Sequence, residues 1–340
     1  MKTTALVNNP VQLIVFGEIN RDFILTRAGK ASADIPGGSA LYFSIGAAVW
    51  KRERIGVISK VGDDFPMSKI SFLSEYGVDQ VGIRILPHPL DNRVFHSGIA
   101  DENNSSSPSF HYLTVGSELP RALLGYDPKF KSKKKQFPNL SDGSLAIPPE
   151  YLKSNLAHFC SNQNAYQIAL TALMQSKYPG LVSLFVTDVP DQRRSKDMLL
   201  ASLNSVFCVF IKKTAMRDLF SLDSTDYESL QKHATQIKSE YVVVLLGEQG
   251  RILLDTRSNK KWFIPLYPIQ AVNPTGKNHS FCGGFCAKVR ENYDPVEAVL
   301  AGAVSSSLVA SGVGLNFALE TSQKLIETRF NRLHTLIRRL

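Results

Sequence analysis

The chain has 340 residues, of which 44% are hydrophobic and 20% are charged, and its formal net charge is +9 at pH 7. This composition is typical of a globular protein with one large core and excludes an extensively disordered chain. No uncharged apolar stretch reaches about 18 residues and the first residues lack the apolar centre of a signal peptide, so we expect a cytoplasmic protein that does not span a membrane.

The excess of positive charge permits attraction to phosphate-rich partners. It is most concentrated in one lysine cluster: Lys129, Lys131, Lys133, Lys134 and Lys135. A charge run of this kind is usually a solvated loop, and no nucleic-acid-binding motif surrounds it, so we do not expect nucleic-acid binding. The four cysteines lack C-x-x-C spacing and lie in apolar segments, which predicts reduced core residues and no metal site: Cys160, Cys208, Cys282 and Cys286.

In the first half of the chain, apolar runs and turn residues predict strands separated by helices. A buried strand is expected at 11–18, a helix at 40–49, a strand and helix start over 55–66, and a strand at 81–86. Short polar strands are expected within 23–35 and 93–113, with strands at 98–100 and 110–112 joined by a hairpin at 101–108. A long loop is expected over 119–147.

In the second half of the chain, predicted strands and helices alternate more regularly. Strands are predicted at 156–160, 181–187, 205–210 and 241–246, with helices at 165–176, 195–204 and 231–239. A hairpin at 251–255 and 261–265 and three helices, at 277–289, 295–311 and 324–340, complete the chain. This alternation predicts a doubly wound, mostly parallel sheet with helices on both faces.

Two polar segments follow predicted strands, at residues 17–22 (GEINRD) and 36–44 (PGGSALYFS). Ligands of open α/β sheets bind beyond the carboxyl ends of the strands, so Asn20 and Asp22 are candidate ligand-binding residues. The paired Gly37 and Gly38 permit close approach of the backbone to a ligand. The alternative is that Asn20 and Asp22 only form a turn, because both residue types favour one.

A third segment, residues 273–285 (NPTGKNHSFCGGF), is a loop that leads into a helix. The first N–H groups of a helix have no partner within it and attract anions. The backbone from Gly276 to His279 is therefore the predicted anion site.

Residues 273–285 resemble the carboxyl-terminal signature of the PfkB (ribokinase-like) carbohydrate kinases, D-[TP]-[TV]-G-A-G-D-x-F-x-x-G-F. Residues 36–44 are similar to the first signature of this family, residues 17–22 to its G-S-x-N-x-D segment, and residues 246–250 (LGEQG) to its L-G-x-x-G turn. The resemblance extends over nearly the whole chain. It implies one α/β domain over 1–340 with a small β-sheet lid formed by about 23–36 and 88–115.

The resemblance also implies a site that binds a sugar or nucleoside together with ATP and Mg²⁺. The residues that it assigns to substrate binding are Asn20, Asp22, Gly37, Gly38 and Tyr42. It assigns Gly247 and Gly250 to the nucleotide, and Gly276, Lys277 and Asn278 to the anion hole. A homodimer formed through the lid is a further expectation.

The chain departs from the family pattern at the positions that the family uses for phosphoryl transfer. His279 stands at the position of the family's general base, an Asp, and Lys277 and Asn278 replace Ala and Gly. The family's metal-organising N-x-x-E is missing after the strand at 205–210, where Lys212 and Lys213 stand instead, so we expect impaired phosphoryl transfer with retained ligand binding. Two alternatives are open: an active phosphotransferase with an unusual site, and a basic structural subunit of a larger assembly.

Overall fold

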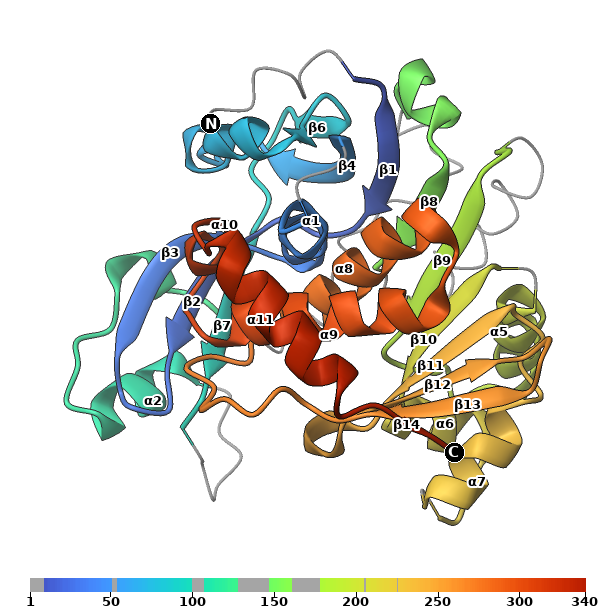
Figure 1. Cartoon of the computed structure of the whole chain (residues 1–340). Helices are drawn as coiled ribbons and strands as arrows, with labels where there is room; N and C mark the ends of the chain where they lie inside the picture. Colours follow the sequence, from blue (N-terminus) through green and yellow to red (C-terminus); the bar gives the residue numbers. More distant parts are fainter. Residues whose placement is uncertain are drawn as a thin grey trace.

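The computed structural model describes residues 9–50, 54–99, 107–127, 147–160, 178–204, 206–224 and 226–340. Figure 1 shows a large twisted sheet with helices on both faces and a small sheet set to one side of it. The predicted helix at 165–176 and the lysine cluster at 129–135 lie outside the described residues. Within the described part, no helix is long and apolar enough to cross a membrane.

The large sheet has the strand order β14-β13-β12-β11-β10-β9-β8-β1-β4-β5, with β6 also paired to β4. Its strands are β1 (Val11–Phe16), β4 (Arg54–Gly62), β5 (Val78–Asp79), β6 (Ile83–Leu86), β8 (Leu156–Phe159), β9 (Leu181–Val186), β10 (Cys208–Lys212), β11 (Tyr241–Leu245), β12 (Arg251–Asp255), β13 (Lys260–Ile264) and β14 (Arg338–Arg339). Pairing is parallel from β11 through β10, β9, β8 and β1 to β4, and antiparallel from β11 to β14. The predicted doubly wound, mostly parallel sheet is confirmed.

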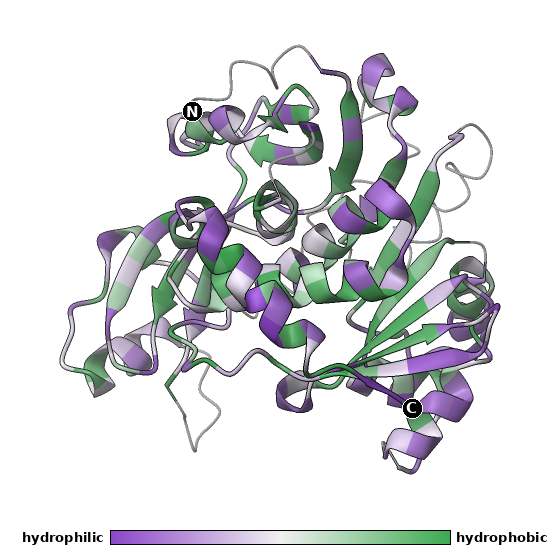
Figure 2. Ribbon diagram, viewed as in Figure 1, coloured by the Kyte–Doolittle hydropathy of each residue, from purple (hydrophilic) through white to green (hydrophobic). Residues whose placement is uncertain are grey.

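The helices cover the two faces because the parallel strands are apolar on both sides. One face packs on α1 (Ser39–Ala48), α8 (Lys277–Asn292), α9 (Pro295–Ala310), α10 (Asn316–Leu319) and α11 (Gln323–His334); the other packs on α5 (Arg193–Leu203), α6 (Lys213–Phe220) and α7 (Tyr227–Ala234). Figure 2 shows the central strands as mainly hydrophobic and the outer side of α11 as hydrophilic. All four cysteines are buried, as predicted; they lie in the core on the α1, α8 and α9 side and form no disulfide.

The small sheet has the order β3-β2-β7 and forms the lid. β2 (Asn20–Leu25) pairs antiparallel with β3 (Ala31–Gly37) and parallel with β7 (Arg93–Ser97). The expected strand at 98–100 is therefore misplaced, since the pairing strand ends at Ser97. The expected strand at 110–112 is wrong: these residues belong to α2 (Pro108–Thr114), where Pro108 starts the helix and His111 and Tyr112 lie one turn later on the same buried face.

Three further expectations need correction. The terminal helix ends at His334, and the chain then forms β14, in which Arg338 lies over the Phe263 ring of β13, 4.9 Å from its centroid. Short 3-10 helices occur at Met67–Lys69 and Ser71–Tyr76, where one helix start was expected, and also at Arg121–Leu123, Pro149–Lys153 and Gly247–Gln249. The predicted strand at 205–210 ends two residues later, at Lys212, and α6 follows it directly.

Candidate functional site

A cavity of about 380 Å³ lies where the lid meets the carboxyl ends of β9 and β10 and the first turn of α8; we call it the lid cavity. Eight of the residues that the sequence predicted line it: Asn20, Asp22, Gly38, Tyr42, Gly276, Lys277, Asn278 and His279. Gly37 lies one residue before the lining. Segments separated by more than 200 residues along the chain are thus brought to one site.

Asp22 is the buried acid of this cavity. The Tyr42 hydroxyl donates a hydrogen bond to Asp22 Oδ2 over 3.3 Å, and His96 Nε2 of β7 lies 3.4 Å from Oδ1 without forming a hydrogen bond to it. Burial raises the pKa of Tyr42 well above its usual value, and the Asp22 carboxylate adds to this, so the hydroxyl remains a donor. Gly37 makes room for the carboxylate, because a Cβ there would lie 1.9 Å from Asp22 Oδ2.

Asn20 is held at the same edge by the backbone around it. Gly38 has φ = 98°, and a Cβ there would lie 2.4 Å from the Glu18 carbonyl oxygen, so this turn requires glycine. Asn20 is 7% exposed, and its Oδ1 has no hydrogen-bond partner among the described residues. Buried polar atoms are normally paired, so this oxygen is available to a ligand hydroxyl.

The amino terminus of α8 forms the opposite wall. Gly276 takes a left-handed φ of 79°, and a Cβ on it would lie 2.1 Å from the Tyr42 ring. Asn273 Oδ1 accepts hydrogen bonds from the Thr275 N–H and hydroxyl, which orders the loop before the helix. Within the described part of the chain, the N–H groups of Asn278 and His279 have no acceptor, as expected for a helix start that can receive an anion.

His279 occupies this helix start as a neutral base. Its half-buried ring meets the Phe185 ring edge to face, with centroids 5.2 Å apart, and its Nδ1 has no partner among the residues described. Burial lowers the pKa of His279 to about 3, and the positive charge of Lys212 contributes in the same direction. The imidazole is therefore uncharged at neutral pH.

Lys212 ends β10 and lines the lid cavity beside His279. No group of three or more His, Cys, Asp or Glu side chains among the described residues is arranged to hold a metal ion. Mg²⁺ prefers several oxygen ligands. At this corner of the cavity stands the Lys212 ammonium, whose positive charge contributes to the lowered pKa of His279 and would likewise repel a cation. The residues present do not fit a Mg²⁺ site at the end of β10.

A second cavity, of about 310 Å³, lies between the β11–β12 turn, α9 and the 266–274 segment; we call it the hairpin cavity. Pro274 and Lys277 line both cavities, so the two meet at the start of α8. Lys277 Nζ forms an ion pair with Glu248 Oε1 over 2.7 Å across this junction.

Gly247 and Gly250, the predicted nucleotide-binding residues, shape the turn without lining the hairpin cavity. Both have left-handed backbones, with φ of 69° and 112°, and Leu246 N–H donates to the Gly250 carbonyl. Their neighbours Glu248 and Arg251 line the cavity instead.

Arg251 was not predicted as a site residue. It is buried over the Phe281 ring, 4.3 Å from the centroid, and donates to the Ser306 hydroxyl over 2.8 Å. Burial lowers the pKa of its guanidinium to about 10, which still leaves it charged at neutral pH. His96 was missed as well, because its place beside Asp22 depends on the pairing of β7 with β2. A charged residue directly after the L-G-x-x-G turn was the only sequence signal for Arg251.

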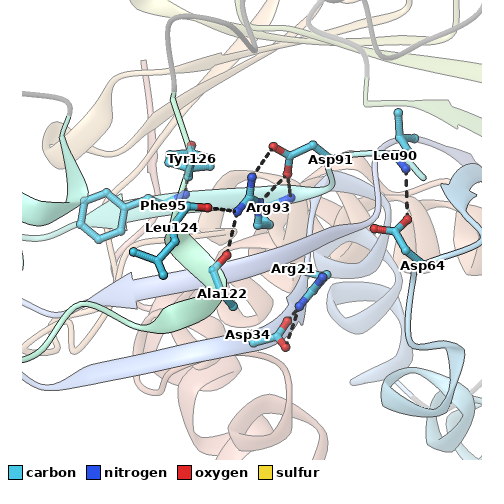
Figure 3. A network of polar contacts seen from close by, with 10 residues as sticks. All are labelled: Arg21, Asp34, Asp64, Leu90, Asp91, Arg93, Phe95, Ala122, Leu124 and Tyr126. Carbon is cyan, nitrogen blue, oxygen red and sulfur yellow. Dashed lines mark hydrogen bonds and ion pairs between the residues drawn. The ribbon is translucent and has the colours of Figure 1, made fainter.

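Ion pairs outside the cavity hold the lid in place (Figure 3). Arg21, between Asn20 and Asp22 on β2, makes a two-point contact with Asp34 of β3, with distances of 2.6 and 3.0 Å. Arg93 of β7 bonds to Asp91 and to the carbonyl groups of Ala122 and Leu124. Adjacent strand residues point to opposite faces, so Arg21 secures the outer face while Asn20 and Asp22 face the cavity.

Comparison with known proteins gives consistent matches. The family model of the pfkB family carbohydrate kinases matches residues 153–322. A cytidine kinase of Thermococcus kodakarensis is 23% identical over 277 residues, which cover 82% of this chain and 88% of that protein.

Solved structures are similar over almost the whole chain. Fructokinase from Vibrio cholerae O395, determined with fructose, ADP and calcium, superposes with a TM-score of 0.66 at 17% identity, covering 94% of this chain and 99% of the other. An E. coli protein described as a ribokinase II, in complex with ATP and Mg²⁺, gives 0.62 at 19% identity and covers 95% and 99% of the two chains. At these identities the matches show a shared fold and nothing more.

Proposed function

The chain belongs to the pfkB family of carbohydrate kinases, and from that premise we propose that it binds a sugar or nucleoside in the lid cavity while transferring phosphoryl groups weakly or not at all. The observation that carries the proposal is the neutral His279, with Lys212 beside it, at the family's base position. Taking a proton from a hydroxyl would turn the neutral imidazole of His279 into a cation, which burial and the neighbouring Lys212 disfavour, whereas the family's Asp is an anion that protonation neutralises. Loss of general-base catalysis alone costs about 10²–10⁴-fold in rate.

The metal side of the reaction supports the same proposal. Phosphoryl transfer depends on Mg²⁺ to neutralise charge on the nucleotide phosphates. The lysine at the end of β10 and the lack of a ligand cluster among the described residues do not favour such an ion. The bulk of Lys277 and Asn278 further narrows the approach to the helix start, where the family has Ala and Gly.

The binding side of the cavity supports retained recognition. Asp22 Oδ1 and Asn20 Oδ1 have no hydrogen bond, and the Tyr42 hydroxyl is fixed by Asp22. Such preorganised acceptors suit the hydroxyl groups of a sugar or ribose, and the volume of about 380 Å³ lies within the usual range for ligand sites. A nucleotide in the hairpin cavity would meet Arg251 and Lys277.

The test combines turnover with binding. We expect ADP release from ATP and Mg²⁺ to stay near background with a panel of sugars and nucleosides. At 100 times its dissociation constant, one panel member should add about 2.7 kcal/mol to the unfolding free energy and raise the melting midpoint by a few degrees. Asp22→Ala should abolish that shift and leave the circular dichroism unchanged, whereas Asp223→Ala, at an exposed acid outside the cavity lining, should preserve it.

Two outcomes would contradict the proposal in different ways. Efficient Mg²⁺-dependent turnover would favour an active phosphotransferase, for which the unpartnered Nδ1 of His279 is the observation in favour. A complete lack of binding across the panel would favour a structural subunit.

A further inference from the structure

We propose that the lid cavity selects the phosphate monoester of a sugar or nucleoside over the unphosphorylated compound. This inference rests on the proposed function, since it names the ligand class of the same cavity. It is motivated by the distribution of charge within the lining, which has acceptors for hydroxyl groups at one end and, at the other, the Lys212 ammonium without an ion pair among the described residues and the Lys277 ammonium paired with an exposed Glu248.

The acceptor end is built on β2. Asn20 and Asp22 each present a buried oxygen without a hydrogen-bond partner among the described residues. These oxygens are suited to hydroxyl groups, which donate, and would repel a phosphate. A ligand must therefore place its polyol part at this end.

The cationic end lies across Tyr42, whose ring packs against Gly276 at the start of α8. The free N–H groups of Asn278 and His279 and the ammonium of Lys212 meet there. Within the described residues, no carboxylate lies within 4 Å of the Lys212 ammonium, and the neutral His279 supplies no compensating charge. A helix start beside an unpaired ammonium favours a dianion such as a phosphate ester.

Lys277 is a second cation, which can exchange its present partner for a bound phosphate with little loss of free energy. Its partner Glu248 has an 85% exposed side chain, and exposed ion pairs contribute only about 0–1 kcal/mol. Because Lys277 lines both cavities, a phosphate at the helix start competes directly with Glu248 for the same ammonium. The same lysine would obstruct transfer yet strengthen the binding of a phosphate already attached to the ligand.

The test is isothermal titration of the full-length protein with matched pairs of ligands: ribose and ribose 5-phosphate, fructose and fructose 1-phosphate, and cytidine and cytidine 5′-monophosphate, with inorganic phosphate as a separate probe. We expect the phosphorylated member of at least one pair to bind ten times or more tightly than its partner, and its affinity to fall as salt rises. Inorganic phosphate should bind weakly, because it lacks the polyol part.

Variants separate the two ends of the cavity. Lys212→Gln and Lys277→Gln should each weaken the phosphorylated ligand about tenfold and change the unphosphorylated partner less than twofold, whereas Glu248→Gln should tighten the phosphorylated ligand. Lys213→Gln is the matched control, since this lysine bonds to Gln249 outside the lid cavity and should leave both affinities unchanged. Melting curves check that each variant is folded.

Equal affinity within every pair would overturn the inference and leave the proposed function standing. Binding of only unphosphorylated compounds would do the same. No binding of any compound would reject both proposals, and an effect of Lys213→Gln equal to that of Lys212→Gln would show a general charge effect in place of a site.

Discussion

His279 shows how one side chain changes character through its surroundings. In water an imidazole titrates near neutral pH, but here burial and Lys212 hold it neutral. Glycines around the lid cavity act just as locally: Gly37 leaves space for the Asp22 carboxylate and Gly276 for the Tyr42 ring. At this scale the two glycines contribute to the site because they lack a side chain that would collide with Asp22 or Tyr42.

The His279 pKa predicts a pH dependence of stability. Its folded-state pKa of about 3 lies below the unfolded value of 6.5, so between these values the unfolded chain binds a proton that the folded chain does not. The free energy of unfolding should therefore fall as pH falls through this window, by up to about 1.4 kcal/mol per pH unit from this residue. Urea unfolding at pH 7 and at pH 5 measures this effect. Between these two pH values, the free energy of unfolding should decrease less for His279→Asn than for the unchanged protein.

A control and a direct probe sharpen this prediction. Asn278→Ala, at the neighbouring position in the first turn of α8, removes no titratable group and should leave the pH dependence unchanged. Proton resonances of the His279 ring should not titrate between pH 5 and pH 8. A midpoint near 6.5 would show that the imidazole is solvated, and the case for a neutral base position would be lost.

At the scale of elements, α8 is the central helix and contacts α1 and α9 through glycines. A Cβ at Gly46 of α1 would lie 2.0 Å from the Ser280 carbonyl oxygen, and one at Gly283 of α8 would lie 2.0 Å from the Phe43 carbonyl oxygen. A Cβ at Gly284 would lie 2.4 Å from the Ser305 hydroxyl oxygen of α9. The paired glycines of the 273–285 segment therefore serve helix packing, which is independent of whether the protein transfers phosphoryl groups.

This packing predicts a non-additive pair of substitutions. Gly46→Ala and Gly283→Ala should each destabilise the protein, by about 1–3 kcal/mol or more, since the obstructing atoms are backbone oxygens. The double variant should lose less than the sum, because separating the two helices once relieves both clashes. Denaturant unfolding of the four proteins measures the coupling, and simple additivity or negligible losses would refute the close contact.

At the scale of the whole molecule, phosphoryl transfer would require residues from the lid, from the edge of the large sheet and from α8. The base position lies on α8, the metal position at the end of β10, and the hydroxyl acceptors on the lid strand β2. Lys277 joins the two cavities from α8 and is bound to the β11–β12 turn through Glu248. The defect in phosphoryl transfer that we propose would therefore involve several elements, and no single substitution would repair it.

We accordingly expect that His279→Asp alone will not produce efficient turnover. The new carboxylate would supply a base, but Lys212 and the crowded helix start would remain. Combining it with Lys212→Asn and Lys277→Ala should raise ADP release further than His279→Asp alone, as measured by a coupled assay with ATP, Mg²⁺ and the bound sugar or nucleoside. Adding Asp22→Ala should abolish the gain; family-like rates from His279→Asp alone would contradict the prediction.

Local sequence determined the alternation of elements, because apolar periodicity and turn residues act over a few positions. It placed most strands of the large sheet, the helix start at 277 and the polar segments at the carboxyl ends of the strands, and it identified His279 and the lysines as departures from the family pattern. These features follow from neighbouring residues and from motif spacing. They were sufficient to predict the fold and eight of the residues that line the lid cavity.

Only the tertiary structure decided which side chains meet. The parallel pairing of β7 with β2 brings His96 to Asp22, and the β11–β12 turn brings Glu248 to Lys277. The packing of β12 against α9 places Arg251 over the Phe281 ring of α8. The helix α2 in place of a strand and the return of the chain end as β14 were likewise missed. Each depends on contacts between residues distant in sequence, whose energies local periodicity does not contain.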